Sequence, residues 1–205
     1  MTPPDGESPP PSGSTVDKTP LRKVLRERRA RYLAAMPPSV RGIAFRVLPS
    51  PVIRRLPTDA TIALYYATGD EAPTANIAGQ LEDLGYRLAL PRMAPKTGAM
   101  HFAEWDVEQI LVPGAFRTLQ PGADAAEVKP DVIIAPLVGY DDALNRLGQG
   151  GGYYDRAFAA YPDALRIGLG WSAQQVERVP VEPHDLPLHM VVTEAAILER
   201  EDSGR

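Results

Sequence analysis

Residues 131–138 read DVIIAPLV and form the most apolar run of the chain. A continuous run of β-branched and aliphatic residues predicts a strand buried on both faces, as in the middle of a mainly parallel sheet. A glycine-rich segment follows, and the sequence then predicts a helix over 153–160, a strand over 166–171 and a last strand over 190–193. A strand, a helix and a second strand in this order form a βαβ unit, whose two strands pair in parallel.

The same alternation occurs earlier in the chain. Residues 61–67 (TIALYYA) predict a short strand, and residues 73–84 predict a helix that Gly85 ends. Residues 86–90 predict a second strand, which Pro91 stops. This region therefore predicts another parallel βαβ unit.

The N-terminal region has a different composition. Residues 1–16 are rich in proline, serine and glycine, which predicts a disordered tail. From Asp17 onward, leucines near helical spacing among many arginines predict an amphipathic helix with a basic outer face. A second helix is predicted over 39–48 and is broken by Pro49 and Pro51.

Together these patterns predict an α/β fold. We expect one domain over residues 17–200, with a mainly parallel open sheet flanked by helices in a three-layer, Rossmann-like arrangement and an N-terminal basic helix. A chain of 205 residues with 44% hydrophobic residues suffices for one buried core. Residues 201–205 are expected to form a short C-terminal tail.

The composition also excludes several functions. The net charge of -4 gives no general attraction to nucleic acid or to an anionic membrane, so neither partner is expected. An RNA-binding role for the basic helix is disfavoured, because aromatic residues do not alternate with its arginines. The absence of cysteine removes disulfides and thiolate metal sites, and the three histidines form no H-E-x-x-H zinc pattern. Since the chain has no secretion-signal pattern and no run of roughly 18 apolar residues, a cytoplasmic location is expected.

The segment 146–156 (RLGQGGGYYDR) is the main candidate site. It follows the most apolar strand and leads into a helix, and ligands of open α/β sheets bind at the carboxyl ends of the strands. Its glycines let backbone N–H groups approach phosphate oxygens, the helix N-terminus adds a favourable dipole, and Arg146 could complement the same charge. The segment is neither a P-loop nor a dinucleotide fingerprint. Glycines alone would also suit a flexible spacer, but the flanking Arg146, Tyr153, Tyr154 and Asp155 favour a site.

Asp141 together with segment 146–156 resembles the signature of the 5-formyltetrahydrofolate cyclo-ligase family. Three shorter elements occur in the family's order: Lys18-x-x-Leu21-Arg22, Glu71-x-x-Thr74, and His184-Asp185 with Val192-Thr193. The resemblance thus runs from about Lys18 to Glu194. It implies a single-domain α/β fold in which ATP and a folate meet above one edge of the sheet, with magnesium bridging the phosphates.

The resemblance also implies roles for individual residues. The residues expected at ATP are Lys18, Arg22, Arg146, Leu147, Gly148, Gln149, Gly150, Gly151, Gly152, Tyr153 and Tyr154. Those expected at the folate are Glu71, Phe116 and Tyr153, with Trp105 as a further aromatic candidate. Asp155 and Asp185 are expected to hold Mg²⁺, and Arg146 and Asp155 are the expected catalytic residues.

For several of these residues a plainer role is also open. Lys18 and Arg22 could belong to a solvated basic face, Asp155 could cap a helix, and Asp185 could be a turn residue. The aromatic candidates could equally be core residues. The sequence departs from the family pattern at four positions: Leu144, where a glycine is common, Gly151, where lysine is frequent, Pro73, and Gln120, where glutamate is frequent.

The activity implied by the resemblance is the ATP- and Mg²⁺-dependent conversion of 5-formyltetrahydrofolate to 5,10-methenyltetrahydrofolate, with release of ADP and phosphate. It would proceed by phosphorylation of the formyl oxygen and attack by N10, and the chain is expected to be a monomer. The alternatives are a non-catalytic folate- or nucleotide-binding regulator on the same scaffold, and a kinase or ligase for another small molecule.

Overall fold

The computed structural model describes residues 17–94, 99–115, 118–183 and 185–200. The predicted tails 1–16 and 201–205 lie outside the described residues, as do Phe116 and His184. Within the described residues, no helix is both long and apolar enough to cross a membrane.

A seven-stranded sheet with the order β11-β10-β9-β6-β1-β2-β3 forms the centre of the molecule. Its strands are β1 (Thr61–Ala63), β2 (Arg87–Met93), β3 (Met100–Trp105), β6 (Val132–Pro136), β9 (Leu165–Leu169), β10 (Met190–Val192) and β11 (Ile197–Glu199). The five inner strands pair in parallel, whereas β3 and β11 are antiparallel edge strands. The predicted mainly parallel α/β fold is therefore confirmed.

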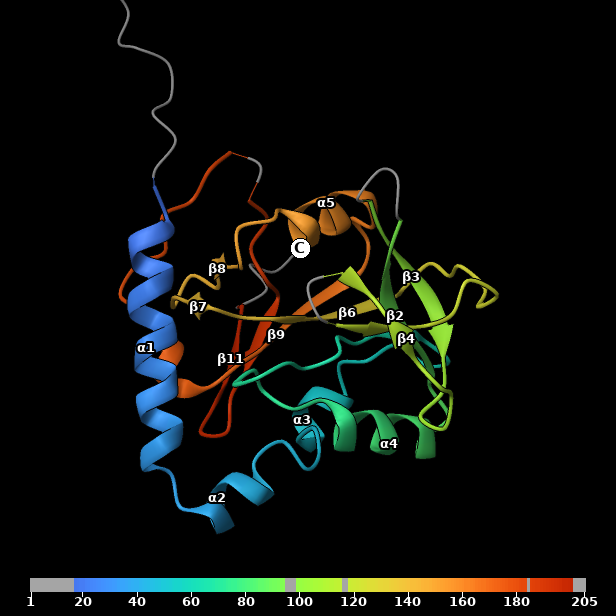
Figure 1. Cartoon of the computed structure of the whole chain (residues 1–205), viewed down its shortest axis with the longest axis horizontal. Coiled ribbons are helices and arrows are strands. Elements are labelled where there is room, and N and C mark those ends of the chain that lie inside the picture. Colours follow the sequence, from blue (N-terminus) through green and yellow to red (C-terminus); the bar gives the residue numbers. More distant parts are fainter. Residues whose placement is uncertain (1–16, 95–98, 116–117, 184, 201–205) are drawn as a thin grey trace, which may run out of the picture.

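Helices cover both faces of this sheet (Figure 1). The helices are α1 (Thr19–Ala35), α2 (Pro38–Ile43), α3 (Ser50–Ile53), α4 (Ala75–Asp83), α5 (Tyr153–Ala160) and the short 3-10 helix η2 (Ser172–Gln174). In Figure 1, α5 lies above the sheet, α3 and α4 lie below it, and α1 stands along one side, beside β7 (Gly139–Tyr140) and β8 (Arg146–Leu147). One more small ribbon joins β4 (Val112–Pro113) to β5 (Leu119–Gln120).

The central strand β6 shows why the predicted strand had no polar alternation. Val132 and Ile134 pack into the core cluster on the α4 side, while Ile133 and Ala135 pack into the cluster on the α5 side. All four are fully buried. Successive side chains of a strand point to opposite faces, so a strand covered on both faces must be apolar throughout.

Two predicted boundaries were wrong. The helix predicted over 39–48 ends at Ile43, because Ala44 leaves the helical conformation with a ψ of 134°. The next residue, Phe45, has a positive φ of 55°, and its ring packs against Trp171 with centroids 4.9 Å apart. The strand predicted to stop at Pro91 continues to Met93. Since β1 pairs with β2 no further than Ala89, the ladder requires no N–H from Pro91 on that side.

Two other predicted strands have shifted ends, and one predicted helix has the expected bounds. The strand predicted over 61–67 ends at Ala63, the strand predicted over 166–171 runs from Leu165 to Leu169, and the helix over 153–160 is found as predicted. The two antiparallel edge strands β3 and β11 were not predicted.

Candidate active site at the carboxyl ends of the strands

A cavity of about 720 Å³ opens at the carboxyl ends of the parallel strands. Tyr65 follows β1, Met93 ends β2 and Pro136 ends β6, and all three line it. This is the edge at which ligands of open α/β sheets bind. Apart from the aromatic candidate Trp105, every predicted site residue that the structure describes also lines this cavity: Lys18, Arg22, Glu71, Arg146, Leu147, Gly148, Gln149, Gly150, Gly151, Gly152, Tyr153, Tyr154, Asp155 and Asp185.

The β7–β8 hairpin carries Arg146 into the cavity, and Asp141 fixes its turn. The buried Asp141 carboxylate accepts hydrogen bonds from the backbone N–H of Asn145 at 2.9 Å and of Val179 at 2.8 Å. Leu144, in the same turn, has a φ of 61°, in the left-handed region that favours glycine. The side chain of Leu144 is buried in the core cluster beneath α5.

The glycine segment, residues 148–152, leaves room for neighbouring side chains. A Cβ added at Gly148 would lie 2.6 Å from Nη1 of Arg146, and one at Gly151 would lie 2.5 Å from the Tyr153 ring. The Tyr153 ring is in turn covered by the Arg156 guanidinium, 4.8 Å from its centroid. Gly151 stands where the family frequently has lysine. In this chain the Tyr153 ring occupies the space that a side chain at position 151 would need.

Helix α1 contacts the glycine segment through its inner face. Arg22 Nε donates to the carbonyl of Gly148 at 2.8 Å, and Arg26 Nη2 donates to Gln149 Oε1 at 2.5 Å. Lys18 is buried, and its Nζ lies 2.5 Å from Asp185 Oδ2 and 3.2 Å from Glu182 Oε2. Lys18 and Arg22 therefore belong to the cavity wall and not to a solvated basic face.

Arg146 is the most enclosed cation of the cavity. Its side chain is only 4% exposed, and Nη2 donates to Asp155 Oδ1 at 2.7 Å. The guanidinium carbon lies 5.5 Å from the ring centroids of both Tyr154 and Phe158, within the range of a cation–π contact. No side-chain capping bond forms at the start of α5. The Asp155 carboxylate therefore pairs with Arg146 and does not cap the helix.

Asp185 combines a turn with a position at the cavity. Its Oδ2 accepts the backbone N–H of Glu182 at 2.8 Å as well as the Lys18 ammonium. Within the described ranges, no group of three or more His, Cys, Asp or Glu side chains could hold a metal by itself. Mg²⁺ typically uses one or two carboxylates with waters and substrate phosphates, so Asp155 and Asp185 fit such an ion.

Glu71 lines the cavity at the turn that follows β1. Its Oε2 accepts the backbone N–H of Thr68 at 2.9 Å, and Gln149 Nε2 donates to its Oε1 at 3.3 Å. Thr74, the other residue of the Glu-x-x-Thr element, donates to the carbonyl of Tyr65 at 2.7 Å. The element therefore places a carboxylate at the cavity and anchors the chain behind it.

Two tyrosines of the cavity stay protonated near neutral pH. Burial raises the pKa of Tyr154 well above its ordinary value, and the Glu71 carboxylate raises it further. Burial and Glu71 likewise raise the pKa of Tyr65, whose hydroxyl donates to the carbonyl of Ala72 at 2.6 Å. Neither hydroxyl can act as a base at neutral pH, but both can donate hydrogen bonds.

Sequence reasoning missed the apolar half of the cavity. This half comprises Tyr66, Pro91, Met93, Met100 and Leu119. Met93 and Met100 face each other in the β2–β3 pair, and the side chain of Gln120 accepts the backbone N–H of Met93 at 3.2 Å. Among these residues only Tyr66 lay in a predicted strand. The antiparallel strand that brings Met100 to the cavity was not predicted.

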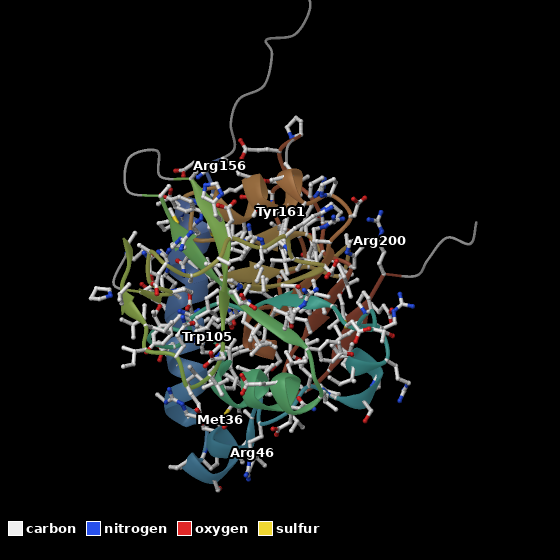
Figure 2. The ribbon with its side chains drawn as sticks, turned by 90° about the vertical axis from the view of Figure 1, so that its right-hand side faces the viewer. Met36, Arg46, Trp105, Arg156, Tyr161 and Arg200 are labelled. Atoms are coloured by element: carbon white, nitrogen blue, oxygen red, sulfur yellow. The ribbon has the colours of Figure 1, made fainter. Side chains whose placement is uncertain are left out.

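The structure removes Trp105 from the aromatic candidates. Trp105 ends β3 and packs against the core cluster on the α4 side. Figure 2 shows it well below Arg156, which follows the glycine segment and lies near the top of the view. The core role left open for this residue is therefore the correct one. The other aromatic candidate, Phe116, lies outside the described residues.

An open, mainly parallel sheet with a glycine segment and a cavity at its strand ends, lined by both cations and carboxylates, defines a Rossmann-like α/β protein with a ligand site at the usual edge. Comparison with known proteins narrows this class. The profile of the 5-formyltetrahydrofolate cyclo-ligase family matches residues 14–194.

Similar proteins agree with this match. The 5-formyltetrahydrofolate cyclo-ligase of Escherichia coli K12 is 34% identical over 146 residues, which cover 68% of this chain and 80% of that protein. The cyclo-ligase of Haemophilus influenzae is 31% identical and covers 62% of this chain and 72% of its own. The NMR structure of Aquifex aeolicus 5,10-methenyltetrahydrofolate synthetase superimposes with a TM-score of 0.67 at 27% identity, over 92% of this chain and 94% of that one. The chain belongs to the 5-formyltetrahydrofolate cyclo-ligase family, which confirms the resemblance found in its sequence.

Proposed function

We propose that this protein converts 5-formyltetrahydrofolate and ATP to 5,10-methenyltetrahydrofolate, ADP and phosphate, with Mg²⁺ bound at the phosphates. The observation that carries the proposal is the composition of one cavity. Segments far apart in the sequence contribute Lys18, Glu71, Arg146 and Asp185 to it, and its lining combines cations paired with carboxylates and a group of apolar side chains. Such a cavity suits a polyphosphate beside a flat, partly apolar ring system.

ATP is required because the N5-formyl group is an amide, whose carbon is a poor electrophile and whose oxygen is a poor leaving group. Transfer of the γ-phosphoryl group to the formyl oxygen releases ADP and makes that oxygen part of a phosphate ester. N10 then attacks the formyl carbon and loses its proton, and phosphate departs with the former formyl oxygen. The methenyl bridge remains between N5 and N10.

In this proposal the protein aligns the substrates and neutralises charge, and no side chain acts as a nucleophile. Arg146, Lys18 and Arg22 stabilise the negative charge of the transferring group, together with the backbone N–H groups of the glycine segment. Glu71 accepts hydrogen bonds from N–H groups of the pterin. Bound Mg²⁺ would neutralise phosphate charge, with Asp155 and Asp185 as its protein ligands.

The ion pairs of the cavity support this division of roles. Each proposed metal carboxylate is paired with a proposed phosphate cation: Asp155 with Arg146, and Asp185 with Lys18. With Mg²⁺ and a triphosphate bound, Asp155 and Asp185 would hold the metal, and Arg146 and Lys18 would pair with phosphate instead of with the carboxylates. No buried charge would then be left without a partner. This matters because an unpaired buried charge is strongly destabilising.

The test is to follow the near-ultraviolet absorbance of the methenyl product with purified protein. We expect absorbance to grow only when 5-formyltetrahydrofolate, ATP and Mg²⁺ are all present, with ADP formed in equal amount. Binding of both ligands without any growth would instead establish the non-catalytic regulator. ADP formation without the methenyl product would point to a different phosphoryl acceptor.

A further inference from the structure

The side chain of Gln149 connects the two sides of the cavity. Its Oε1 accepts a hydrogen bond from Arg26 Nη2 at 2.5 Å, and its Nε2 donates to Glu71 Oε1 at 3.3 Å. An amide has one accepting and one donating end, so it can join a guanidinium to a carboxylate in only one orientation. The opposite orientation would face donor with donor and acceptor with acceptor.

Both ends of this bridge are anchored in the cavity wall. On one side, Arg26 lies one helical turn after Arg22, whose Nε holds the carbonyl of Gly148. On the other side, Glu71 is held by the backbone N–H and the hydroxyl of Thr68, at 2.9 and 3.2 Å. The bridge therefore links α1, the glycine segment and the turn at 68–71, which are distant in the sequence and all line the cavity.

We propose that Gln149 is a positioning residue that couples the nucleotide side of the cavity to the folate side. This inference rests on the proposed function, because it takes the glycine segment as the nucleotide site and Glu71 as a folate contact. A nucleotide that orders the glycine segment also fixes the Gln149 amide, and the amide then holds the Glu71 carboxylate in place for the pterin. Binding of the first ligand thus removes part of the ordering cost of the second.

Coupling of this kind is reciprocal: the folate must tighten nucleotide binding by the same factor as the nucleotide tightens folate binding. The bridge consists of hydrogen bonds to charged groups at a solvent-exposed position. We therefore expect a coupling factor of about three to ten.

The experiment measures the Kd of a non-hydrolysable ATP analogue with Mg²⁺ by calorimetry, with and without saturating 5-formyltetrahydrofolate. The analogue prevents turnover, so the ratio of the two Kd values is the coupling factor. In Gln149→Met the side chain keeps its length but makes neither hydrogen bond, and we expect a ratio near one. Arg26→Ala should give the same result, whereas Arg26→Lys, which can still donate to the amide oxygen, should retain coupling.

Arg31→Ala is the matched control, because it removes one arginine from an exposed position of the same helix. It should keep the wild-type ratio. Since Gln149 and Arg26 are both exposed, their variants should melt at the wild-type temperature, which excludes unfolding as the cause of lost coupling.

Two results would overturn the inference while leaving the proposed function standing: a wild-type ratio of one, or an unchanged ratio in Gln149→Met. Failure of the wild-type protein to bind either ligand would refute the proposed function itself, and the coupling with it. Loss of coupling in Gln149→Met and Arg26→Ala, with retention in Arg26→Lys and Arg31→Ala, would establish it.

Discussion

The two sides of the cavity are built in different ways. The cationic side consists of Lys18, Arg22, Arg26 and Arg146, and each of these side chains is held by a hydrogen bond or an ion pair. The partners of the first three lie in distant segments, whereas Arg146 pairs with Asp155 in its own segment. The apolar side consists of Tyr66, Pro91, Met93, Met100 and Leu119, and its position depends on the antiparallel β2–β3 pair and the β4–β5 ribbon. Directional contacts thus define the first side, whereas shape and burial define the second.

This difference predicts how mutations will act on the two sides. On the cationic side, charged groups act on charge that develops in the transition state, so substitutions there should lower kcat steeply. On the apolar side, substitutions should remove contact area that substrate and transition state share, and should mainly raise KM.

The largest effect is expected from Arg146→Ala and Asp155→Ala, tested separately. Each should lower the rate of methenyl formation by about 10²- to 10³-fold. Arg146→Ala removes a cation from the transferring phosphoryl group, and Asp155→Ala removes the proposed metal carboxylate that also pairs with Arg146. Arg31→Ala and Asp163→Ala, at exposed positions, are the matched controls. Circular dichroism would verify folding. Near-normal turnover in both site variants would contradict the roles assigned to the ion pair.

The next effect concerns the hairpin that positions Arg146. Leu144→Ala should lower the free energy of unfolding by about 2–4 kcal/mol, because a fully buried leucine is truncated. Leu144→Gly removes even more of the side chain but relieves the positive φ, a gain of about 1 kcal/mol. We therefore expect the glycine variant to be at least as stable as the alanine variant in urea unfolding.

Leu188 provides the comparison, since it is buried in the same cluster and has no positive φ. There the glycine variant should be the less stable of the two, because glycine carries a larger entropic cost of folding. The same order at both positions would show that the backbone at Leu144 is not strained.

A smaller effect is expected on the apolar side. Met100→Ala should raise the KM for 5-formyltetrahydrofolate by about three- to tenfold, with little change in kcat, because lost apolar contact weakens ground state and transition state alike. Met36→Ala is the control, since Met36 lies at the far end of the molecule near α2 (Figure 2). An unchanged KM in steady-state kinetics would exclude Met100 from the folate contact.

The smallest effect at neutral pH is expected from Tyr154→Phe. Because burial and Glu71 raise the pKa of Tyr154, its hydroxyl keeps its proton, and the pH–rate profile between about pH 6 and pH 9 should keep its wild-type shape. If the wild-type profile showed an ionisation in that range and Tyr154→Phe lost it, the hydroxyl would titrate during turnover.

The same tyrosine affects stability at alkaline pH. The unfolded tyrosine loses its proton near pH 10, while the folded one retains it to higher pH. Its contribution to stability is therefore complete below about pH 10 and is lost as the pH rises through the raised pKa. Urea midpoints at pH 7 and above pH 10 should show a shallower alkaline decline in Tyr154→Phe than in the wild type.

The two sides of the cavity also differ in how well the sequence predicted them. The parallel strands, helix α5 and the glycine segment could be predicted, since apolar runs and turn residues act over short distances along the chain. Most predicted site residues came from the cationic side, because charged groups and glycines form recognisable spacings. The apolar side went largely unpredicted, since methionine and leucine are ordinary core residues and carry no positional signal.

By itself, then, the sequence determined the α/β class, the position of the candidate site segment at residues 146–156 and the family to which the chain belongs. Only the tertiary structure decided which charges are paired, as in Lys18 with Asp185, and which side chains bridge the cavity, as in Gln149 with Glu71. Local patterns restrict the backbone residue by residue, whereas these pairings form only when the sheet brings segments far apart in the chain to one edge.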